Sequence, residues 1–221
     1  MQRRNLIAAG LLGIGAVGLY VGATILGGIL DPQYSHVRNA ISELTGTAAP
    51  DRAVLAPLYI VYNVLLLGFG YALFRVASGG FLMAVAVVLF LIGGLSGIGQ
   101  VTLFRMDSVG AAETTAGTLH LVLAGVSSLL CLTIAVLYGF AFRGTSTLRG
   151  LWRYSFATAA LLVLTAPLAV GSIGTDLVGL FERIAIGVFL AWVVVVSAVC
   201  LRAARTVEAN ARRSGHAPAA A

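Results

Sequence analysis

The chain has 221 residues, of which 59% are hydrophobic and only 10% are charged, and its mean hydropathy is +0.99. Because a soluble domain carries about 25% charged residues, this composition excludes an ordinary soluble protein. The net charge of +6 comes from arginine without any lysine. These arginines flank apolar segments, so we interpret them as topology signals and anionic-lipid contacts and expect no nucleic-acid partner.

Six apolar segments are long enough to cross a bilayer as helices of about 20 residues. The predicted spans cover residues 6–30, 53–74, 81–104, 112–142, 151–173 and 177–202, with a tight turn at Ser78-Gly79-Gly80. Arg3-Arg4 resembles a twin-arginine signal, but the apolar run after it continues to Leu30, so we expect this run to remain as the first span. The expected fold is all-α: a polytopic bundle of six transmembrane helices over residues 1–205 and a disordered basic cytoplasmic tail over residues 206–221.

The charges between the spans are sorted by sign in alternate loops. One side holds ten arginines: Arg3, Arg4, Arg75, Arg143, Arg149, Arg153, Arg202, Arg205, Arg212 and Arg213. The other side holds four, Arg38, Arg52, Arg105 and Arg183, with seven of the eight acids. Since cytoplasmic loops are enriched in Arg and Lys, we expect a multi-pass protein of the cell (inner) membrane with both termini in the cytoplasm.

The first outer loop has the pattern of a short amphipathic helix. Asp31-Pro32 is a helix-start pair, and Gly46 is a plausible stop. At helical spacing, one face is apolar and the other is polar: Tyr34, Val37, Ala40, Ile41 and Leu44 against Ser35, His36, Asn39, Ser42 and Glu43. The pattern predicts a helix at the membrane interface, its polar face turned either to water or to a site.

Further polar groups fall at the same depth in the predicted spans. On the fourth span they follow a spacing of three or four residues: Glu113, Gly117, His120, Ala124, Ser127 and Cys131. Asn63 and Gln100 lie on the second and third spans, and Arg183 lies on the sixth. Ionisable groups at membrane depth are costly and tend to pair, so we expect an ion pair between Arg183 and either Glu43 or Asp107.

We expect these groups to line a polar pocket open to the outside, although they could serve only as contacts between helices. The candidate pocket residues are Ser35, His36, Asn39, Ser42, Glu43, Asn63, Gln100, Asp107, Glu113, His120 and Arg183.

Three of these stretches resemble the membrane proteins of domain-of-unknown-function 998. The most specific is Tyr34-Ser35-His36-Val37-Arg38-Asn39-Ala40-Ile41-Ser42-Glu43-Leu44, and the others are the acidic turn at Asp107 followed by His120, and Gly179-Leu180-Phe181-Glu182-Arg183-Ile184 running to Trp192. The resemblance implies a six-helix bundle of bacterial and archaeal membranes and brings no established activity.

Two catalytic patterns are weak. His36 and His120 with an outer carboxylate would suit zinc, but their spacing is not that of a local metal motif, and we expect neither a metal nor a cofactor. Gly94-Leu95-Ser96-Gly97 is similar to the motif of rhomboid proteases, with Ser96 as nucleophile and His120 as base. It lies in the third span, however, where glycines four residues apart also serve helix packing.

The function we expect is the binding of a membrane lipid or a small amphiphilic ligand in an outward-facing pocket. No predicted span has an acid near its centre, as a proton relay would, so coupled transport is disfavoured. One alternative is a membrane-embedded hydrolase or transferase, possibly metal-dependent, that uses His120 and outer-loop carboxylates. The other is a non-catalytic partner subunit or scaffold.

Overall fold

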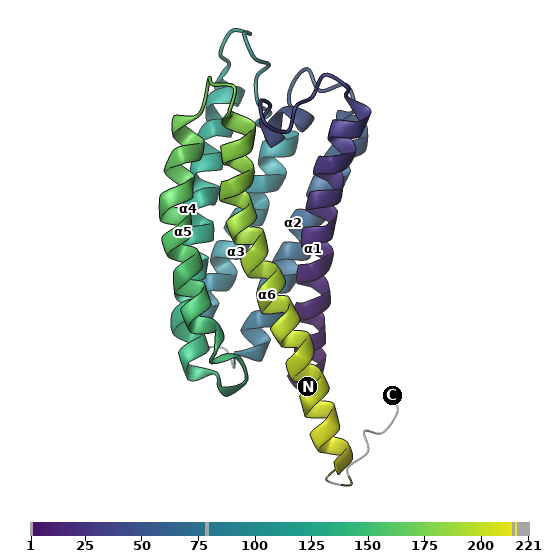
Figure 1. Ribbon diagram of the computed structural model, residues 1–221, viewed down its shortest axis with the longest axis vertical. Coiled ribbons are helices and arrows are strands. Elements are labelled where there is room, and N and C mark those ends of the chain that lie inside the picture. The colour runs from purple at the N-terminus through teal and green to yellow at the C-terminus, as the bar shows by residue number, and fades with distance from the viewer. Residues whose placement is uncertain (1, 78–79, 214, 216–221) are drawn as a thin grey trace.

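A computed structural model describes residues 2–77, 80–213 and 215 as an assembly of helices (Figure 1). The long helices are α1 (Gln2–Leu30), α2 (Arg52–Val76), α3 (Phe81–Thr102), α4 (Thr115–Gly144), α5 (Leu151–Gly171) and α6 (Val178–Arg213). The short 3-10 helices are η1 (Ile41–Thr45) and η2 (Ser146–Leu148). All six long helices have the length and apolar character needed to cross a membrane. The predicted all-α bundle of six spans is confirmed; Ser78 and Gly79 of the predicted turn lie outside the described residues.

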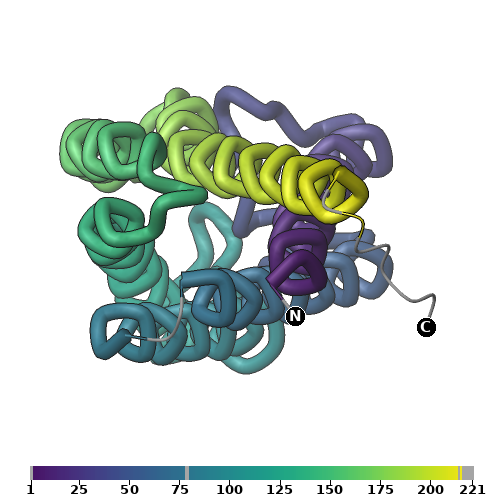
Figure 2. The backbone as a smooth tube through the Cα atoms, turned by 90° about the horizontal axis from the view of Figure 1, so that it is seen from below, coloured from purple at the N-terminus to yellow at the C-terminus, as the bar shows by residue number. Residues whose placement is uncertain are grey.

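The six helices form a ring in chain order. Each long helix packs against the next one, and α6 packs against α1 to close the ring (Figure 2). Gln2 and Arg213 lie at one end of the bundle, which we call the terminal end. The α1–α2, α3–α4 and α5–α6 loops gather at the opposite end, which we call the distal end.

Small residues set the distance at which α1 meets its neighbours. A Cβ atom at Gly10 would collide with the side chain of Leu201, and one at Gly13 would collide with Ser197 and Phe69. In lipid, helices associate through close packing rather than through exclusion of water. These two glycines therefore allow α1, α2 and α6 to lie close together, whereas Gly18 and Gly22 face open space.

Aromatic side chains fill the ring in its terminal half. Phe69, Tyr138 and Trp192 are fully buried there and contact one another or Phe90 edge-on or tilted, at centroid distances of 5.5–6.2 Å. The indole Nε1 of Trp192 donates to the hydroxyl of Ser155 at 2.9 Å, so the buried polar atom is satisfied. We call Phe69, Phe90, Tyr138 and Trp192 the aromatic plug, because together they fill the terminal half of the ring.

The last helix is longer than the sequence predicts. α6 continues to Arg213, past the expected boundary between domain and tail at residues 205 and 206. Glu208 explains the extension, because its carboxylate accepts from Arg3 on α1 and from Arg212 one turn on, each at 2.6 Å. Residues 214 and 216–221 of the expected tail lie outside the described residues.

The amphipathic helix expected between Pro32 and Gly46 forms only as the 3-10 helix η1. Asp31 accepts from the backbone N–H of Gln33 at 2.9 Å, which makes a local turn instead of a helix cap. Residues 32–39 follow as irregular turns. The N–H of Asn39 donates to the carbonyl of Ser35 at 2.8 Å, and the carbonyl of Val37 accepts from the N–H of Leu180 on α6 at 3.0 Å. Contacts distant in sequence thus replace the helix that the spacing predicts.

Candidate functional site

A cavity of about 880 Å³ occupies the distal half of the ring. All six long helices contribute to its walls, and the α1–α2 loop, the α3–α4 loop and the α5–α6 loop surround it at the distal end. Its deepest walls are apolar and reach the aromatic plug at Phe90 and Phe189. We call it the distal cavity; its size falls within the roughly 300–1,000 Å³ of small-molecule sites.

A band of polar groups crosses the middle of the distal cavity. Gln100 on α3 donates to the hydroxyl of Ser127 on α4 at 3.3 Å, and the hydroxyl of Ser96 lies 3.1 Å from that of Ser127. On α2, Asn63 donates to the carbonyl of Tyr59 at 2.8 Å, and its side chain occupies the space that a Cβ at Gly97 would need. Asn63, Gln100 and Ser127 line the cavity, whereas Ser96 only joins Ser127 in the contact between α3 and α4.

Arg183 fastens the α1–α2 loop to α6. Its Nη1 donates to the carbonyls of Asn39 at 3.0 Å and Gly179 at 2.9 Å, and its Nη2 donates to the hydroxyl of Tyr34 at 2.5 Å. The hydroxyl of Tyr34 in turn donates to the carbonyl of Ala40 at 2.9 Å. The loop can approach α6 this closely because a Cβ at Gly179 would collide with the carbonyl of Asn39.

Two carboxylates lie on the cavity side of this loop. The N–H of Ala40 donates to Glu43 Oε1 at 2.7 Å, and the next N–H, that of Ile41, donates to Glu182 Oε2 at 2.6 Å. Asn39 adds a second hydrogen bond to Glu43, from Nδ2 to Oε2 at 2.8 Å. Glu43 and Glu182 both line the distal cavity.

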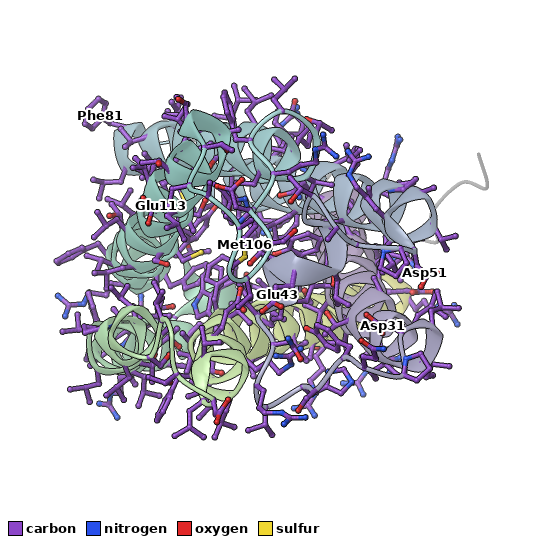
Figure 3. The ribbon with its side chains drawn as sticks, turned by 90° about the horizontal axis from the view of Figure 1, so that it is seen from above. Asp31, Glu43, Asp51, Phe81, Met106 and Glu113 are labelled. Carbon is purple, nitrogen blue, oxygen red and sulfur yellow. The ribbon has the colours of Figure 1, made fainter. Side chains whose placement is uncertain are left out.

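The α1–α2 loop is also tied to the α3–α4 loop. The N–H of Thr47 donates to the carbonyl of Met106 at 3.0 Å, and the hydroxyls of Thr47 and Ser108 are 3.0 Å apart. Figure 3 shows Glu43 and Met106 over the middle of the distal end, with Asp31 and Asp51 toward its edge and Glu113 over α4. The cavity is therefore covered by two loops that are bonded to each other.

The expected ion pair between Arg183 and Glu43 or Asp107 is wrong. Among the described residues, ion pairs within 4.0 Å join only Arg3 and Arg212 to Glu208. Arg183 uses neutral acceptors, and Asp107 instead holds the start of α4 by accepting from the N–H of Thr114 at 2.8 Å and from its hydroxyl at 2.9 Å. Carbonyl and hydroxyl dipoles meet the guanidinium where the sequence led us to expect a charge.

The two histidines lie in different environments. His120 is buried at the cavity wall and donates from Nδ1 to the carbonyl of Phe104 at 2.8 Å. His36 is exposed on the loop, and its Nδ1 accepts from Arg183 Nη2 at 3.1 Å. Partial burial and the charge of Arg183 lower the pKa of His36. No three His, Cys, Asp or Glu side chains in the described part of the chain gather as metal ligands would.

The structure brings together six of the eleven candidate pocket residues. Those lining the distal cavity are Asn39, Ser42, Glu43, Asn63, Gln100 and His120. Ser35, His36 and Arg183 lie behind the cavity wall in the contact between loop and α6, Asp107 caps α4, and Glu113 is exposed. Ser96, proposed as a nucleophile, bonds to Ser127 rather than to His120.

Four residues that line the distal cavity are missing from the candidate list. Tyr20, Tyr62 and Glu182 line the distal cavity, as does Tyr59. The signals that could have identified three of them are two tyrosines three residues apart on α2 and an acid one turn inside α6; Tyr20 on α1 has no such signal. Two stretches of the family resemblance, residues 34–44 and 179–184, are the segments that contact each other through Arg183 and Glu182.

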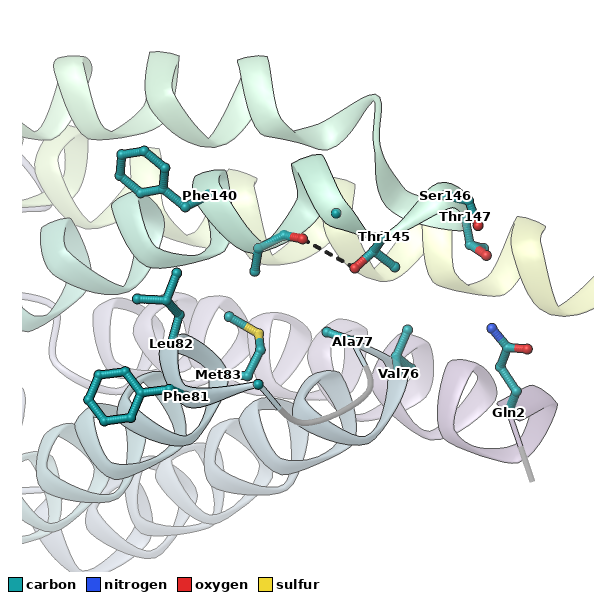
Figure 4. Close-up of a pocket in the computed structure, with 13 residues that line it drawn as sticks. Gln2, Val76, Ala77, Phe81, Leu82, Met83, Phe140, Thr145, Ser146 and Thr147 are labelled. Carbon is teal, nitrogen blue, oxygen red and sulfur yellow. Dashed lines mark hydrogen bonds between the residues drawn. The ribbon is translucent and has the colours of Figure 1, made fainter.

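A second cavity, of about 510 Å³, lies at the terminal end between α3, α4 and η2 (Figure 4). Val76, Met83 and Phe140 contribute apolar walls, and Gln2 and Thr145 contribute polar groups. The hydroxyl of Thr145 is occupied by the carbonyl of Ala141 at 3.2 Å. Among the described residues its lining has no ionisable side chain, so this cavity is the weaker candidate.

Comparison with known proteins gives one result. A family model described as "Protein of unknown function (DUF998)" matches residues 14–199. Neither a curated protein nor a solved structure matches the chain.

Proposed function

The chain belongs to the DUF998 family of proteins of unknown function, so its role has to be inferred from its own site, and we propose that the distal cavity binds a lipid-like or small amphiphilic ligand. The observation that carries this proposal is the graded lining of the cavity. Glu43, Asp176 and Glu182 lie near its mouth, whereas Leu66, Phe90 and Leu162 lie deep within it. A molecule with a polar head and an apolar tail matches both regions.

We further propose that the distal end faces the outside of the cell membrane. The terminal end carries ten arginines and the distal end four, and Arg and Lys are concentrated in cytoplasmic loops. In this orientation both termini lie in the cytoplasm, and the ligand enters from the outer side.

Two glycines offer a matched test of binding. Gly125 on α4 lines the distal cavity, and Gly22 on α1 does not; a Cβ at either position meets nothing within 4 Å. Gly125→Leu should therefore fill part of the cavity, whereas Gly22→Leu adds the same side chain on the outside of the ring. Lipid extraction and mass spectrometry of the purified proteins should show a retained amphiphile in the wild type and in Gly22→Leu, and its loss from Gly125→Leu.

The same measurement can reject the proposal. Equal retention of every lipid species by the wild type and by both variants would mean that bound lipid sits on the outer surface of the helices. The passive scaffold would then be the better reading of the fold.

His120 supports a membrane hydrolase or transferase as a second candidate. Its Nδ1–H is held by the carbonyl of Phe104, so the neutral ring carries its lone pair on Nε2, as a general base requires. A wild-type protein incubated with a total lipid extract should then form products that His120→Gln does not form. Identical lipid profiles after incubation with either protein would reject the hydrolase or transferase, and ligand binding would remain as the proposed function.

A further inference from the structure

Three tyrosines form an aromatic wall in the distal cavity. Tyr20 on α1 lies between Tyr59 and Tyr62 on α2, with ring centroids 5.4 and 4.8 Å away and interplanar angles of 76° and 57°. Each of them lines the cavity. The hydroxyl of Tyr59 is fixed by Thr24 at 3.0 Å, which holds that ring in place. The face of an aromatic ring attracts a cation, and several such rings at different angles are a common way to enclose an ammonium group.

A carboxylate lies beside this wall. Glu182 on α6 lines the same cavity as the three tyrosines. Ile186, one turn further along α6, packs against the clusters that contain Tyr59 and Tyr62. Glu43 also lines the cavity and accepts from the N–H of Ala40, next to the N–H of Ile41 that donates to Glu182. Neither carboxylate has a cationic side chain within 4.0 Å among the described residues.

The charge around the cavity is unbalanced. Its described lining includes the carboxylates Glu43, Asp176 and Glu182 but a single arginine, Arg38, on the exposed part of the loop. Arg183 is not part of the cavity lining, because its guanidinium lies in the contact between the loop and α6. An anionic head would be repelled by these carboxylates, whereas a cationic head could form an ion pair with one of them.

From this arrangement we infer that the distal cavity takes an amphiphile whose head is a cationic nitrogen, a primary amine or a quaternary ammonium, held by Glu182 and the faces of Tyr20, Tyr59 and Tyr62. This inference rests on the proposed function, since it names the head of the molecule that the cavity would bind. The tail would occupy the apolar depth near Phe90 and Leu162.

The test compares probes that share a tail and differ in charge. The full-length protein, purified in a neutral maltoside detergent, is titrated with dodecyltrimethylammonium and with dodecyl phosphate, and binding is followed by microscale thermophoresis. The wild type should bind the ammonium probe at least about tenfold more tightly than the phosphate probe. Tetramethylammonium, which has no tail, should bind much more weakly than the dodecyl probe.

Two carboxylates provide matched variants. Glu182→Gln keeps an oxygen that can accept from the N–H of Ile41, so the loop should stay folded while the charge is lost. Glu113→Gln removes a charge from the same end of the protein at an exposed position outside the cavity. The preference for ammonium should fall about tenfold in Glu182→Gln and persist in Glu113→Gln. A preference unchanged in Glu182→Gln, or equal losses in both variants, would overturn the inference.

Failure of this inference differs from failure of the proposed function. If Gly125→Leu abolishes the binding of both dodecyl probes while the wild type prefers neither, the cavity binds amphiphiles and only the cationic head is wrong. If Gly125→Leu binds both probes as the wild type does, the proposed function itself fails. Tight, Glu182-dependent binding of tetramethylammonium would support the cation site and identify a soluble amine in place of a lipid as its ligand.

Discussion

Arg183 illustrates how a partly buried charge can be held without a counter-ion. Its guanidinium is planar and can donate several hydrogen bonds in fixed directions, so carbonyl and hydroxyl oxygens from different segments can meet it together. The donors reach Asn39, Gly179 and Tyr34, and the guanidinium carbon lies 5.5 Å from the centroid of the Tyr34 ring. The loop and α6 are joined through this one side chain.

Replacing Arg183 should therefore loosen the distal end. We expect Arg183→Leu to lower the free energy of unfolding by about 2–4 kcal/mol, because it removes several charge-assisted hydrogen bonds and leaves buried acceptors unpaired. Arg105→Leu is the control, since Arg105 lies at the same end and makes no hydrogen bond to a described residue. Thermal unfolding in detergent measures both.

The double variant Arg183→Leu/Asp107→Asn tests whether Arg183 and Asp107 interact. Asp107 bonds to Thr114 and not to Arg183, so the two substitutions should have additive effects on stability. A double variant much more stable than the sum of the single effects would restore the ion pair that the sequence suggested.

His36 should make stability depend on pH. Its folded pKa is lowered below the usual 6.5, so the unfolded chain binds more protons than the folded protein as the pH falls. The stability is thus fully present above pH 6.5 and is lost as the pH falls from 6.5 toward the lowered folded pKa. Between pH 7 and pH 5 the Tm of the wild type should drop more than that of His36→Gln, whose amide oxygen can still accept from Arg183. Parallel decreases would assign the pH dependence to other groups.

The α1–α2 loop shows what a spacing pattern can and cannot predict at the level of an element. In an amphipathic helix, the backbone hydrogen bonds of residues 32–44 would form within the segment itself. The spacing of apolar and polar residues can predict only such a local structure. The folded loop instead bonds to Leu180 and Glu182 on α6 and to Met106 beyond α3. These partners are distant in sequence, so periodicity could not reveal them.

Thiol labelling distinguishes the two conformations of this loop. Val37 and Ile41 would share the apolar face of a helix and would both be protected from an aqueous reagent. In the structure Val37 is 44% exposed and Ile41 only 5%. In a background with Cys131 and Cys200 changed to Ala, Val37→Cys should label rapidly and Ile41→Cys slowly. Protection of both positions would bring back the amphipathic helix.

The long helices were predictable because their boundaries depend on hydropathy and local caps. α4 begins at Thr115, three residues after the predicted start, because the side chain of Thr114 accepts from the N–H of Gly117 at 3.1 Å. α6 passes its predicted end because Glu208 pairs with Arg3 at the other end of the chain. The first shift is local and small, whereas the second depends on the closed ring and could not be read from the segment alone.

At the scale of the whole molecule, the distribution of arginine predicts the orientation in the membrane. A reporter fused after Ala221 should be active only in the cytoplasm, and one inserted in the 45–51 loop should report from outside. An extracytoplasmic signal from the C-terminal fusion would place the distal cavity on the cytoplasmic side and reverse the direction from which its ligand enters.

The aromatic plug has a consequence for the energetics of the bundle. The lining of the distal cavity reaches Phe90, and the ring beyond it is filled by Phe69, Tyr138 and Trp192, so a ligand in the cavity would exchange with the distal side only. At equilibrium its occupancy then reports the chemical potential of the ligand on that side, and a concentration difference across the bilayer exerts no driving force on it. With the plug in place, the proposed ligand would be bound without being carried across the bilayer; translocation would require the side chains of α2, α3, α4 and α6 to separate together.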